Sequence, residues 1–370
     1  SGGPISDLSK FSMLPALDSL RFLFFEPQGE NLPGGSALNG EISLGSPSPL
    51  NLILQRFIDG RWQTEEEFNP GTLEQALSIV AEHEITTENN SNHTITPGGF
   101  AGLLGYDLGR WSNSIRIKNS PQPGTLLGVL WRCDAWWIHN RQKGELILLA
   151  LEGHDWINAA MPELTDLKIP SIPDSRVPES ESDSDHARKV ERIRQAIKGG
   201  HLYQVNYGRK WQGEMEGKPW EVFLRMTRSN PAPFASWLNL ADYGWAIASA
   251  SPERLMRLES GIVSTRPIKG TRPRNENPTE DERLRVELLN CTKESAEHMM
   301  LVDLERNDIG IVSKPGSVRH ELFQVEGYSQ VQHLVSEVKG ELNRNEDVWS
   351  ALQALFPGRS EEHTSELQSP

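Results

Sequence analysis

The feature that most constrains the fold lies between residues 251 and 308, where a strand with a lysine precedes a helix with two glutamates. The segment 262–269 is typical of a strand, so Lys269 is expected to share a face with Val263 and Thr265 while Arg266 points the other way. A strand followed by a helix indicates a mixed α/β or α+β protein. It also places an amine and several carboxylates in one short stretch of chain.

Two regions of this chain are separated by a polar stretch. Residues 1–168 alternate short apolar runs, such as 20–25, with clusters of Gly, Pro and Asn, which is typical of strands and turns. Residues 169–185 are rich in Ser, Pro, Asp and Glu, a composition that predicts an exposed linker. A helix that uses Asp185 as its N-cap and a short strand over 203–206 are expected to follow.

Charge and composition restrict the partners. A net charge of −14 argues against broad contact with nucleic-acid phosphates, although a local arginine cluster can still hold a small anion. The sequence has no apolar run long enough for a membrane span and no basic-then-apolar leader, so neither is expected. Two cysteines, Cys133 and Cys291, cannot build a disulfide framework. We therefore expect a cytoplasmic protein without nucleic-acid or membrane partners.

Lys269 is the candidate nucleophile. An exposed lysine has a pKa near ~10.4 and is a protonated, non-nucleophilic cation at neutral pH. Burial, or the positive charges of Arg272 and Arg274, would lower that pKa and free the amine. A lysine in a basic turn is more often a surface side chain, so the residues by themselves leave both interpretations open.

Glu253 is the candidate general acid or base. It follows the apolar run 246–250, which is typical of a buried strand, and Pro252 fixes the local turn. A carboxylate at a strand end is well placed for proton transfer. The alternative is a structural salt bridge to Arg254 or Arg272.

Glu294 and Glu297 are the candidate metal ligands. They are three residues apart on the predicted helix, so both project from one face and repel each other unless a cation lies nearby. Mg²⁺ favours carboxylate oxygens together with water and substrate oxygens. The alternative is a solvated acidic face balanced by Lys293 and Arg306.

Two histidines and one polar group complete the candidates. His298 is turned by about 100° from Glu297 around the helix, so a packing or hydrogen-bonding role is expected. His333 can shuttle protons near neutral pH, although a histidine in an apolar segment is usually structural. A polar group after residues 299–302 predicts a structural turn: Asp303, Arg306, Asn307 and Asp308.

Together these blocks resemble the chorismate-utilising enzymes, the family of anthranilate synthase component I. The similarity spans about residues 90–358 and rests on Ser-Pro-Glu-Arg-Leu at 251–255, Pro-Ile-Lys-Gly-Thr at 267–271 and the run 293–308. The lysine of Pro-Ile-Lys-Gly-Thr, where other branches usually have alanine, resembles the branch that makes 4-amino-4-deoxychorismate for 4-aminobenzoate and folate synthesis. Gln-Val-Asn at 204–206 is similar to the same branch.

The resemblance implies an α+β fold with two packed antiparallel β-sheets flanked by helices. Residues 1–168 would form the component I-like N-terminal region, and residues 186–358 a chorismate-binding catalytic region that is incomplete at its C-terminus. Residues 359–370 match the translation of a common sequencing adapter, so a non-native tail is expected there. On this basis we expect the 370-residue chain to be inactive.

The resemblance also implies roles for individual residues. Lys269 would attack C2 of chorismate and be expelled when ammonia adds at C4, while Glu253 assists proton transfer at the departing C4 hydroxyl. His333 would be an active-site histidine. Glu294 and Glu297 would bind Mg²⁺ weakly, because the second pair of glutamates found in the family is absent. The ammonia would come from a glutamine amidotransferase subunit.

Two alternatives stand beside this interpretation. Anthranilate synthase component I places ammonia on C2 and expels pyruvate, and both Lys269 and Asn206 argue against it. A non-catalytic, truncated binding protein is favoured by the adapter-like tail.

Overall fold

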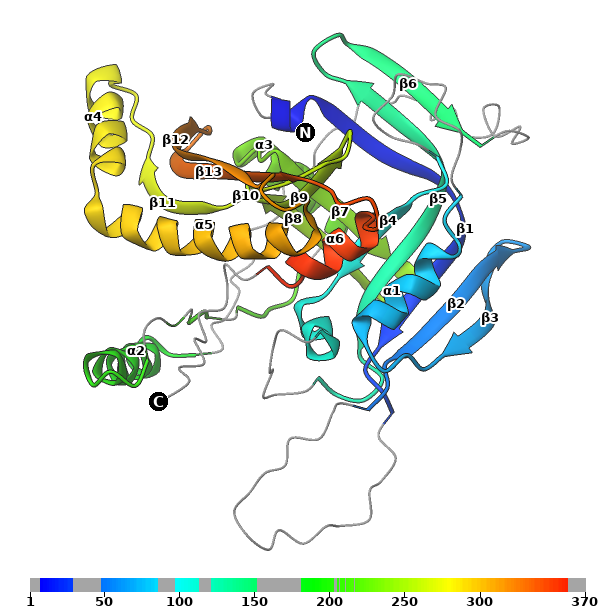
Figure 1. Ribbon diagram of the computed structural model, residues 1–370. Helices are drawn as coiled ribbons and strands as arrows, with labels where there is room; N and C mark the ends of the chain where they lie inside the picture. The colour runs from blue at the N-terminus through cyan, green and yellow to red at the C-terminus, as the bar shows by residue number, and fades with distance from the viewer. Residues whose placement is uncertain are drawn as a thin grey trace, which may run out of the picture.

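The computed structural model describes residues 7–28, 48–85, 97–112, 121–151, 181–202, 205, 207–209, 211–215 and 217–358. This part of the chain contains three antiparallel β-sheets and six α-helices (Figure 1). It confirms the predicted α+β class, in which antiparallel sheets are flanked by helices. The small third sheet was not expected.

The six-stranded sheet is built from the N-terminal region. Its strands run in the order β3-β2-β1-β5-β4, and β6 pairs with β5. Their bounds are β1 (Phe11–Phe25), β2 (Asn51–Ile58), β3 (Arg61–Phe68), β4 (Phe100–Leu104), β5 (Leu126–Asn140) and β6 (Glu145–Ala150). Leu20, Phe22 and Phe24 alternate along β1 and are buried in one core with helix α1 (Leu73–Ala81). The apolar run predicted to be a strand is therefore confirmed.

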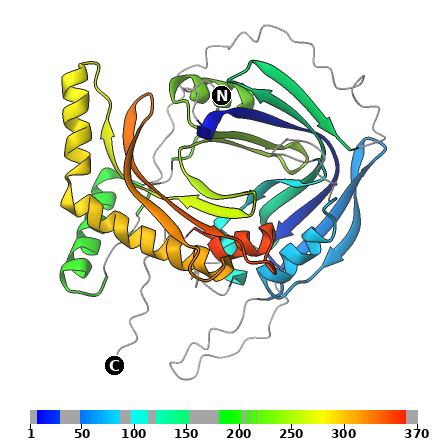
Figure 2. The same cartoon turned by 45° about the horizontal axis from the view of Figure 1, so that its top comes forward.

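The five-stranded sheet surrounds one central strand, β13. It contains β9 (Arg254–Glu259), β10 (Ile262–Arg266), β11 (Ile268–Pro273), β12 (Arg319–Gly327) and β13 (Val331–Glu341). Helices α4 (Pro278–Leu289) and α5 (Thr292–Val312) lie on one side of it (Figure 2). Val302 and Ile309 of α5 are fully buried with Val263 and Val338 of the sheet, so apolar packing holds α5 in place.

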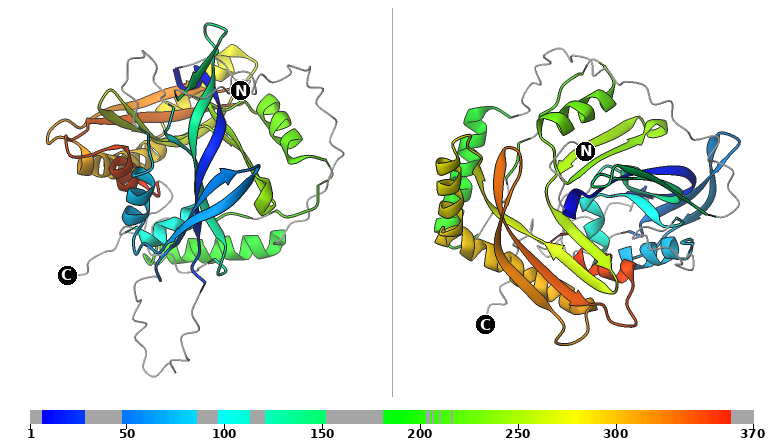
Figure 3. Two further views of the ribbon diagram at one scale, coloured as in Figure 1. Left: turned by 90° about the vertical axis from the view of Figure 1, so that its right-hand side faces the viewer. Right: turned by 90° about the horizontal axis from the view of Figure 1, so that it is seen from above.

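The third sheet pairs β7 (Phe234–Leu240) with β8 (Trp245–Ser251), and helix α3 (Pro219–Ser229) packs beside it (Figure 3). Leu240 at the end of β7 is buried with Leu23 and Val129 of the six-stranded sheet. The small sheet is therefore anchored to the N-terminal region through an apolar contact.

Helix α6 (Val348–Leu355) connects the two large sheets. Ala351 and Leu355 are buried with the core of the five-stranded sheet, whereas Trp349 and Phe356 pack against the core of the six-stranded sheet. The Trp349 indole Nε1 donates a hydrogen bond to the Glu84 carboxylate at 3.0 Å. The described parts of the N-terminal and catalytic regions thus share packing, as Figure 2 shows from the position of α6 between α1 and α5.

Three local predictions need correction or fall outside the structure. The expected turn over 303–308 is wrong, because α5 continues as a helix to Val312 and its buried face carries Val302, Ile309 and Val312. The N-cap of α2 (Asp183–Lys198) is Ser182 rather than Asp185, since the Ser182 hydroxyl accepts the Asp185 N–H. Most of the predicted strand at 203–206, and the whole tail 359–370, lie outside the described residues.

Two further expectations concern the whole fold. Cys133 and Cys291 are both free thiols. Within the described ranges, the longest helices are too short or too polar to cross a membrane.

The shared packing of α6 predicts a large stability effect from one side chain. Leu355→Ala removes an apolar group that is 1% exposed, so we expect the free energy of unfolding to fall by about 2–5 kcal/mol. Chemical denaturation followed by tryptophan fluorescence and by circular dichroism measures this change. Arg344→Ala, at an exposed position in the preceding turn, should stay within about 0.5 kcal/mol of wild type. Equal effects of the two substitutions would contradict the proposed packing.

Candidate active site

The site is organised by an irregularity in the strand that carries Lys269. Strands β10 and β11 pair with the same edge of β13 in one continuous register, from Ile262 opposite Glu341 to Ile268 opposite Val335. Pro267 does not break this pairing, because its carbonyl accepts the Ser336 N–H at 3.2 Å. The predicted strand 262–269 is therefore divided at Pro267, but its two halves pair with the same edge of β13 in one register.

The register then shifts by one residue immediately after Ile268. Ile268 lies opposite Val335 and Thr271 opposite His333, so Lys269 and Gly270 together face one residue of β13. This is a β-bulge, a device that bends a strand and redirects a side chain. Gly270 adopts a φ of +93°, which a residue with a side chain rarely tolerates.

Glu253 contacts the backbone just before the bulge. Its Oε1 accepts the Ile268 N–H at 2.8 Å, so the carboxylate takes a hydrogen bond that a neighbouring strand would otherwise accept. The arginines predicted as alternative partners bond to other carboxylates: Arg254 to Glu337 and Arg272 to Glu294 and Glu287. The Glu253 carboxylate is thus fixed one residue away from Lys269.

Glu294 contacts the bulge from α5. A Cβ atom built on Gly270 would lie only 2.0 Å from the Glu294 Oε2, so glycine is required for this approach. The same Oε2 is buried and has no hydrogen-bond partner among the described residues, whereas Oε1 accepts the Arg272 Nη1 at 2.7 Å. One oxygen of Glu294 therefore keeps an open acceptor position beside the bulge.

The two arginines that follow the bulge are both ion-paired. Arg272 bonds to Glu287 and Glu294, and Arg274 bonds to Asp281 at 2.8 Å. The sequence suggested that these charges would act on Lys269. In the structure their carboxylate partners balance them, so neither guanidinium is an uncompensated charge beside the lysine.

His298 lies beneath Lys269 in the interior between α5 and the sheet. The ring is fully buried, and its Nε2 lies 2.6 Å from the Ser336 Oγ, which also accepts the Phe323 N–H at 3.2 Å. Burial lowers the pKa of His298 to about 4, the Lys269 charge acts in the same direction, and the nearby Lys269 carbonyl opposes both. The hydrogen-bonding role predicted for His298 is confirmed, with a neutral imidazole at pH 7.

A second bulge lies on the opposite edge of β13. The register of β12 shifts between Glu321 and Gln324, and Phe323 there has a φ of +58°. The Phe323 ring packs on His298 with centroids 5.6 Å apart. A strained non-glycine backbone persists only where its surroundings hold it, and here the hydrogen bond to Ser336 helps to do so.

His333 lies directly across from the residue that ends the first bulge. Its Nδ1 is 2.9 Å from the Thr271 Oγ1, and its ring packs on Tyr328 at 5.4 Å between centroids. Burial lowers the pKa of His333, while the Gly270 backbone and Glu326 oppose that shift. The imidazole therefore favours its neutral form near the bulge.

Glu297 is the more exposed of the two candidate metal ligands. Its side chain is 35% exposed, and the Lys293 Nζ lies 3.8 Å from its Oε1. No cluster of three or more Asp, Glu, His or Cys side chains forms a cation site among the described residues. Mg²⁺ is often held by only one or two carboxylates, with water and substrate oxygens completing the shell. The open oxygen of Glu294 and the neighbouring Glu297 fit that smaller requirement.

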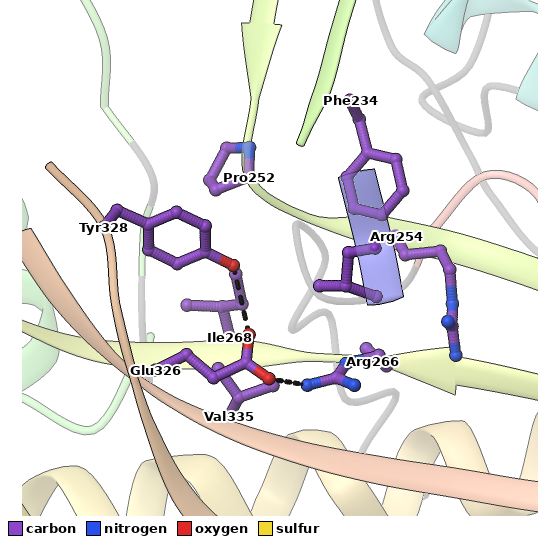
Figure 4. Close-up of a pocket in the computed structure, with 9 residues that line it drawn as sticks. Phe234, Pro252, Arg254, Arg266, Ile268, Glu326, Tyr328 and Val335 are labelled. Carbon is purple, nitrogen blue, oxygen red and sulfur yellow. Dashed lines mark hydrogen bonds and ion pairs between the residues drawn. The ribbon is translucent and has the colours of Figure 1, made fainter. Parts of the chain in front are cut away.

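Two pockets lie close to this segment. One has a volume of about 190 Å³ and is lined by Glu253, Arg254, Leu255, Thr265 and Glu305. The other is narrow and lies beside Ile268; there the Tyr328 hydroxyl donates to Glu326 at 3.1 Å and Arg266 pairs with the same carboxylate (Figure 4). Lys269 lines neither pocket, and 190 Å³ is below the roughly 300–1,000 Å³ of common small-molecule sites.

Four of the five predicted site residues therefore meet on the four-residue segment 268–271. Glu253 bonds to its first residue, Lys269 is its second, Glu294 touches its third and His333 bonds to its fourth. Glu297 lies one turn further along α5. Sequence reasoning missed the contributions of Thr271 and Ser336, because small hydroxyl residues in a strand carry no distinctive pattern.

Comparison with known proteins identifies the family. Residues 51–360 match the family described as chorismate binding enzyme. The chain belongs to this family. It is 37% identical over 272 residues to aminodeoxychorismate synthase component 1 of Salmonella typhimurium, an overlap covering 71% of this chain and 58% of that protein. It is 36% identical to an anthranilate synthase component I-like protein of Synechocystis, covering 75% of this chain and 58% of the relative.

A solved structure has a similar fold. The crystal structure of anthranilate synthase component I from Streptococcus pneumoniae superposes with a TM-score of 0.69 at 23% identity, covering 98% of this chain and 75% of that one. This likeness supports the architecture. The chain spans about 58% of the length of both curated relatives above.

The contact between Gly270 and Glu294 predicts different costs for two glycine substitutions. Gly270→Ala adds a Cβ that collides with the Glu294 carboxylate, whereas Gly261→Ala, at φ +75°, has nothing within 4 Å. Both variants strain a left-handed backbone, which costs about 1–2 kcal/mol, but only Gly270→Ala should lose clearly more than that. Urea unfolding of both variants measures the difference. If the two lose the same stability, Glu294 does not pack against the bulge.

The buried imidazole predicts a loss of stability in acid. Because the pKa of His298 is about 4 in the fold and about 6.5 in an unfolded chain, the unfolded state binds more protons between these values. The free energy of unfolding should therefore fall as the pH drops from 6.5 toward 4, by up to about 3 kcal/mol from this group. His298→Gln should flatten the slope in denaturation curves collected across that range. An unchanged slope would mean that the ring is not held neutral.

Proposed function

We propose that this protein aminates chorismate at C4 to form 4-amino-4-deoxychorismate, the precursor of 4-aminobenzoate in folate synthesis. The observation that carries the proposal is the position of Lys269 in the segment 268–271, which Glu253, Glu294 and His333 also contact. Relatives named aminodeoxychorismate synthase component 1 share 34–37% identity with the chain, which supports the same chemistry.

The reaction proceeds in two displacements. The Lys269 amine forms a bond to C2 of chorismate, the ring double bonds shift, and the C4–oxygen bond breaks. Glu253 donates the proton with which the C4 hydroxyl leaves as water. Ammonia then forms a bond to C4, the double bonds shift back, and the C2–nitrogen bond to Lys269 breaks. Glu253 takes up the proton that the new amine releases, which restores the starting state.

The other residues of the site position these groups. The Ile268 N–H orients the Glu253 carboxylate. His333 and Thr271 form a neutral hydrogen-bonding pair that would lie beside the chorismate ring. Glu294 and Glu297 would hold Mg²⁺, which when bound would neutralise the ring carboxylate of chorismate. The bulge matters because it places Lys269 directly before Gly270, the residue that the Glu294 carboxylate contacts.

Ammonia is proposed to come from a glutamine amidotransferase subunit. Such a partner would deliver ammonia beside C4 without exposing it to solvent, where it would be protonated. An ammonium salt at alkaline pH replaces the partner in an assay of the isolated chain.

A second candidate is anthranilate synthase component I. Anthranilate synthase component 1 of Cereibacter sphaeroides is 33% identical over 309 residues, so the same fold and much of the same sequence serve that reaction. It places the amino group on C2 and eliminates pyruvate. The amine of Lys269 favours the C4 reaction because it provides the nucleophile that covalent displacement at C2 requires.

The test assays the product of the natural gene read past residue 358 with chorismate, ammonium and Mg²⁺ and identifies the product by mass, since the 370-residue chain itself is expected to be inactive. We expect 4-amino-4-deoxychorismate, and we expect Lys269→Ala to keep less than about 1% of the activity because the nucleophile is gone. Lys339→Ala is the matched control, since Lys339 is an exposed lysine on the same sheet paired with Glu321. Glu253→Gln should lose about 10²–10⁴-fold.

Each other outcome points to a different function. Anthranilate with pyruvate would establish the second candidate and would overturn the role of Lys269. Chorismate binding measured by calorimetry, without turnover in wild type, would instead identify a binding protein. Equal activity of Lys269→Ala and Lys339→Ala would exclude the covalent mechanism.

A further inference from the structure

Arg272 bonds to two carboxylates at the edge of the site. Its Nη1 donates to the Glu294 Oε1 at 2.7 Å, and its Nε donates to the Glu287 Oε1 at 2.8 Å. The guanidinium thereby bridges α5 to α4 from strand β11. The paired carboxylates raise the pKa of Arg272, with Glu294 the larger cause, so the group stays charged at every accessible pH.

Glu294 therefore divides its two oxygens between different tasks. Oε1 accepts a hydrogen bond from Arg272, and Oε2 is buried against Gly270 without a hydrogen-bond partner in the part of the chain that the structure describes. A divalent cation bound at Glu294 would share this carboxylate with the guanidinium. Because the cation and the Arg272 guanidinium are both positively charged, each weakens the binding of the other to Glu294.

We infer that Arg272 competes with the divalent cation for the Glu294 carboxylate and so sets the affinity of the proposed Mg²⁺ site. The inference rests on the metal role proposed above for Glu294 and Glu297. Arg272 is then a positioning residue that occupies the Glu294 Oε1 and repels the incoming cation. Its planar fork allows it to give up Glu294 and keep Glu287, because the two carboxylates bond to different nitrogens.

The neighbouring charges support a guanidinium that stays in place after release. Glu287 is held from its other side by Arg283, whose Nη1 donates to Oε2 at 3.1 Å. Glu287 thus remains a fixed partner for Arg272 when Glu294 turns to a cation. A lone lysine in this position would provide one point charge and could not keep both carboxylates in a planar arrangement.

The test measures the binding of Mn²⁺ alone, which is paramagnetic and replaces Mg²⁺ at oxygen sites. The free Mn²⁺ signal is followed by electron paramagnetic resonance as the ion is titrated into each variant, and Mg²⁺ is then added to displace it. Arg272→Gln should bind Mn²⁺ about tenfold more tightly, the change expected for removing one positive charge about 6 Å from a divalent ion. Arg272→Lys keeps the charge and should lie between this variant and wild type.

Two controls separate this effect from others. Arg285→Gln on the same helix as Glu287 changes the net charge equally but removes an exposed ion pair to Glu282, so its Mn²⁺ affinity should match wild type within about twofold. Glu294→Gln should abolish the Mn²⁺ binding that is assigned to Glu294 and Glu297. Circular dichroism and thermal unfolding of each variant establish that the protein being titrated is folded.

One result would overturn the inference about Arg272, and a different result would overturn the metal role of Glu294 on which it rests. If Arg272→Gln binds Mn²⁺ equally or less tightly while Glu294→Gln loses binding, Arg272 holds the carboxylate in place and does not compete. If Glu294→Gln binds Mn²⁺ like wild type, the proposed metal role of Glu294 is wrong. Should Arg272→Gln fail to fold, Arg272→Lys decides, because a tighter-than-wild-type affinity still distinguishes competition from clamping.

Discussion

The approach of the Glu294 carboxylate to the backbone of Gly270 is the contact on which the site depends. It requires a residue without a side chain, a positive φ and a register shift in the same place, and the Lys269–Gly270 bulge provides all three. The bulge is in turn possible because β13 is paired on both edges and buried beneath α5, so local distortion does not unravel the sheet. Remote apolar packing thus supports a strained polar centre.

Electrostatic pairing keeps this centre ordered. Arg254, Arg266, Arg272 and Arg274 all lie on or beside strands β9 to β11, and each bonds to a carboxylate on another element. The fully buried imidazole of His298 is neutral and bonded to Ser336. Buried charge without a partner is costly, so pairing lets a strongly charged segment lie against an apolar core.

Sequence patterns predicted the elements that carry this chemistry. The strand with Lys269, the helix with Glu294 and the hydrogen-bonding role of His298 all follow from local periodicity and residue type, and the structure contains them. The helical stretch 303–308 was missed, because a cluster of Asp, Arg and Asn favours turns locally while buried Val302, Ile309 and Val312 favour helix through packing. We expected the charges of Arg272 and Arg274 to act on Lys269. In the structure these arginines are paired with carboxylates on helices α5 and α4.

The sequence by itself determined the class of fold, the family and the residue types available for catalysis, because these depend on local patterns and on long ordered motifs. Tertiary structure decided which atoms meet. That Glu253 bonds to Ile268, that Arg272 bridges α4 and α5, and that α6 packs on both cores all join residues far apart in the chain. Such contacts arise only when strands pair and helices dock, since no local periodicity specifies a one-residue shift between two strands.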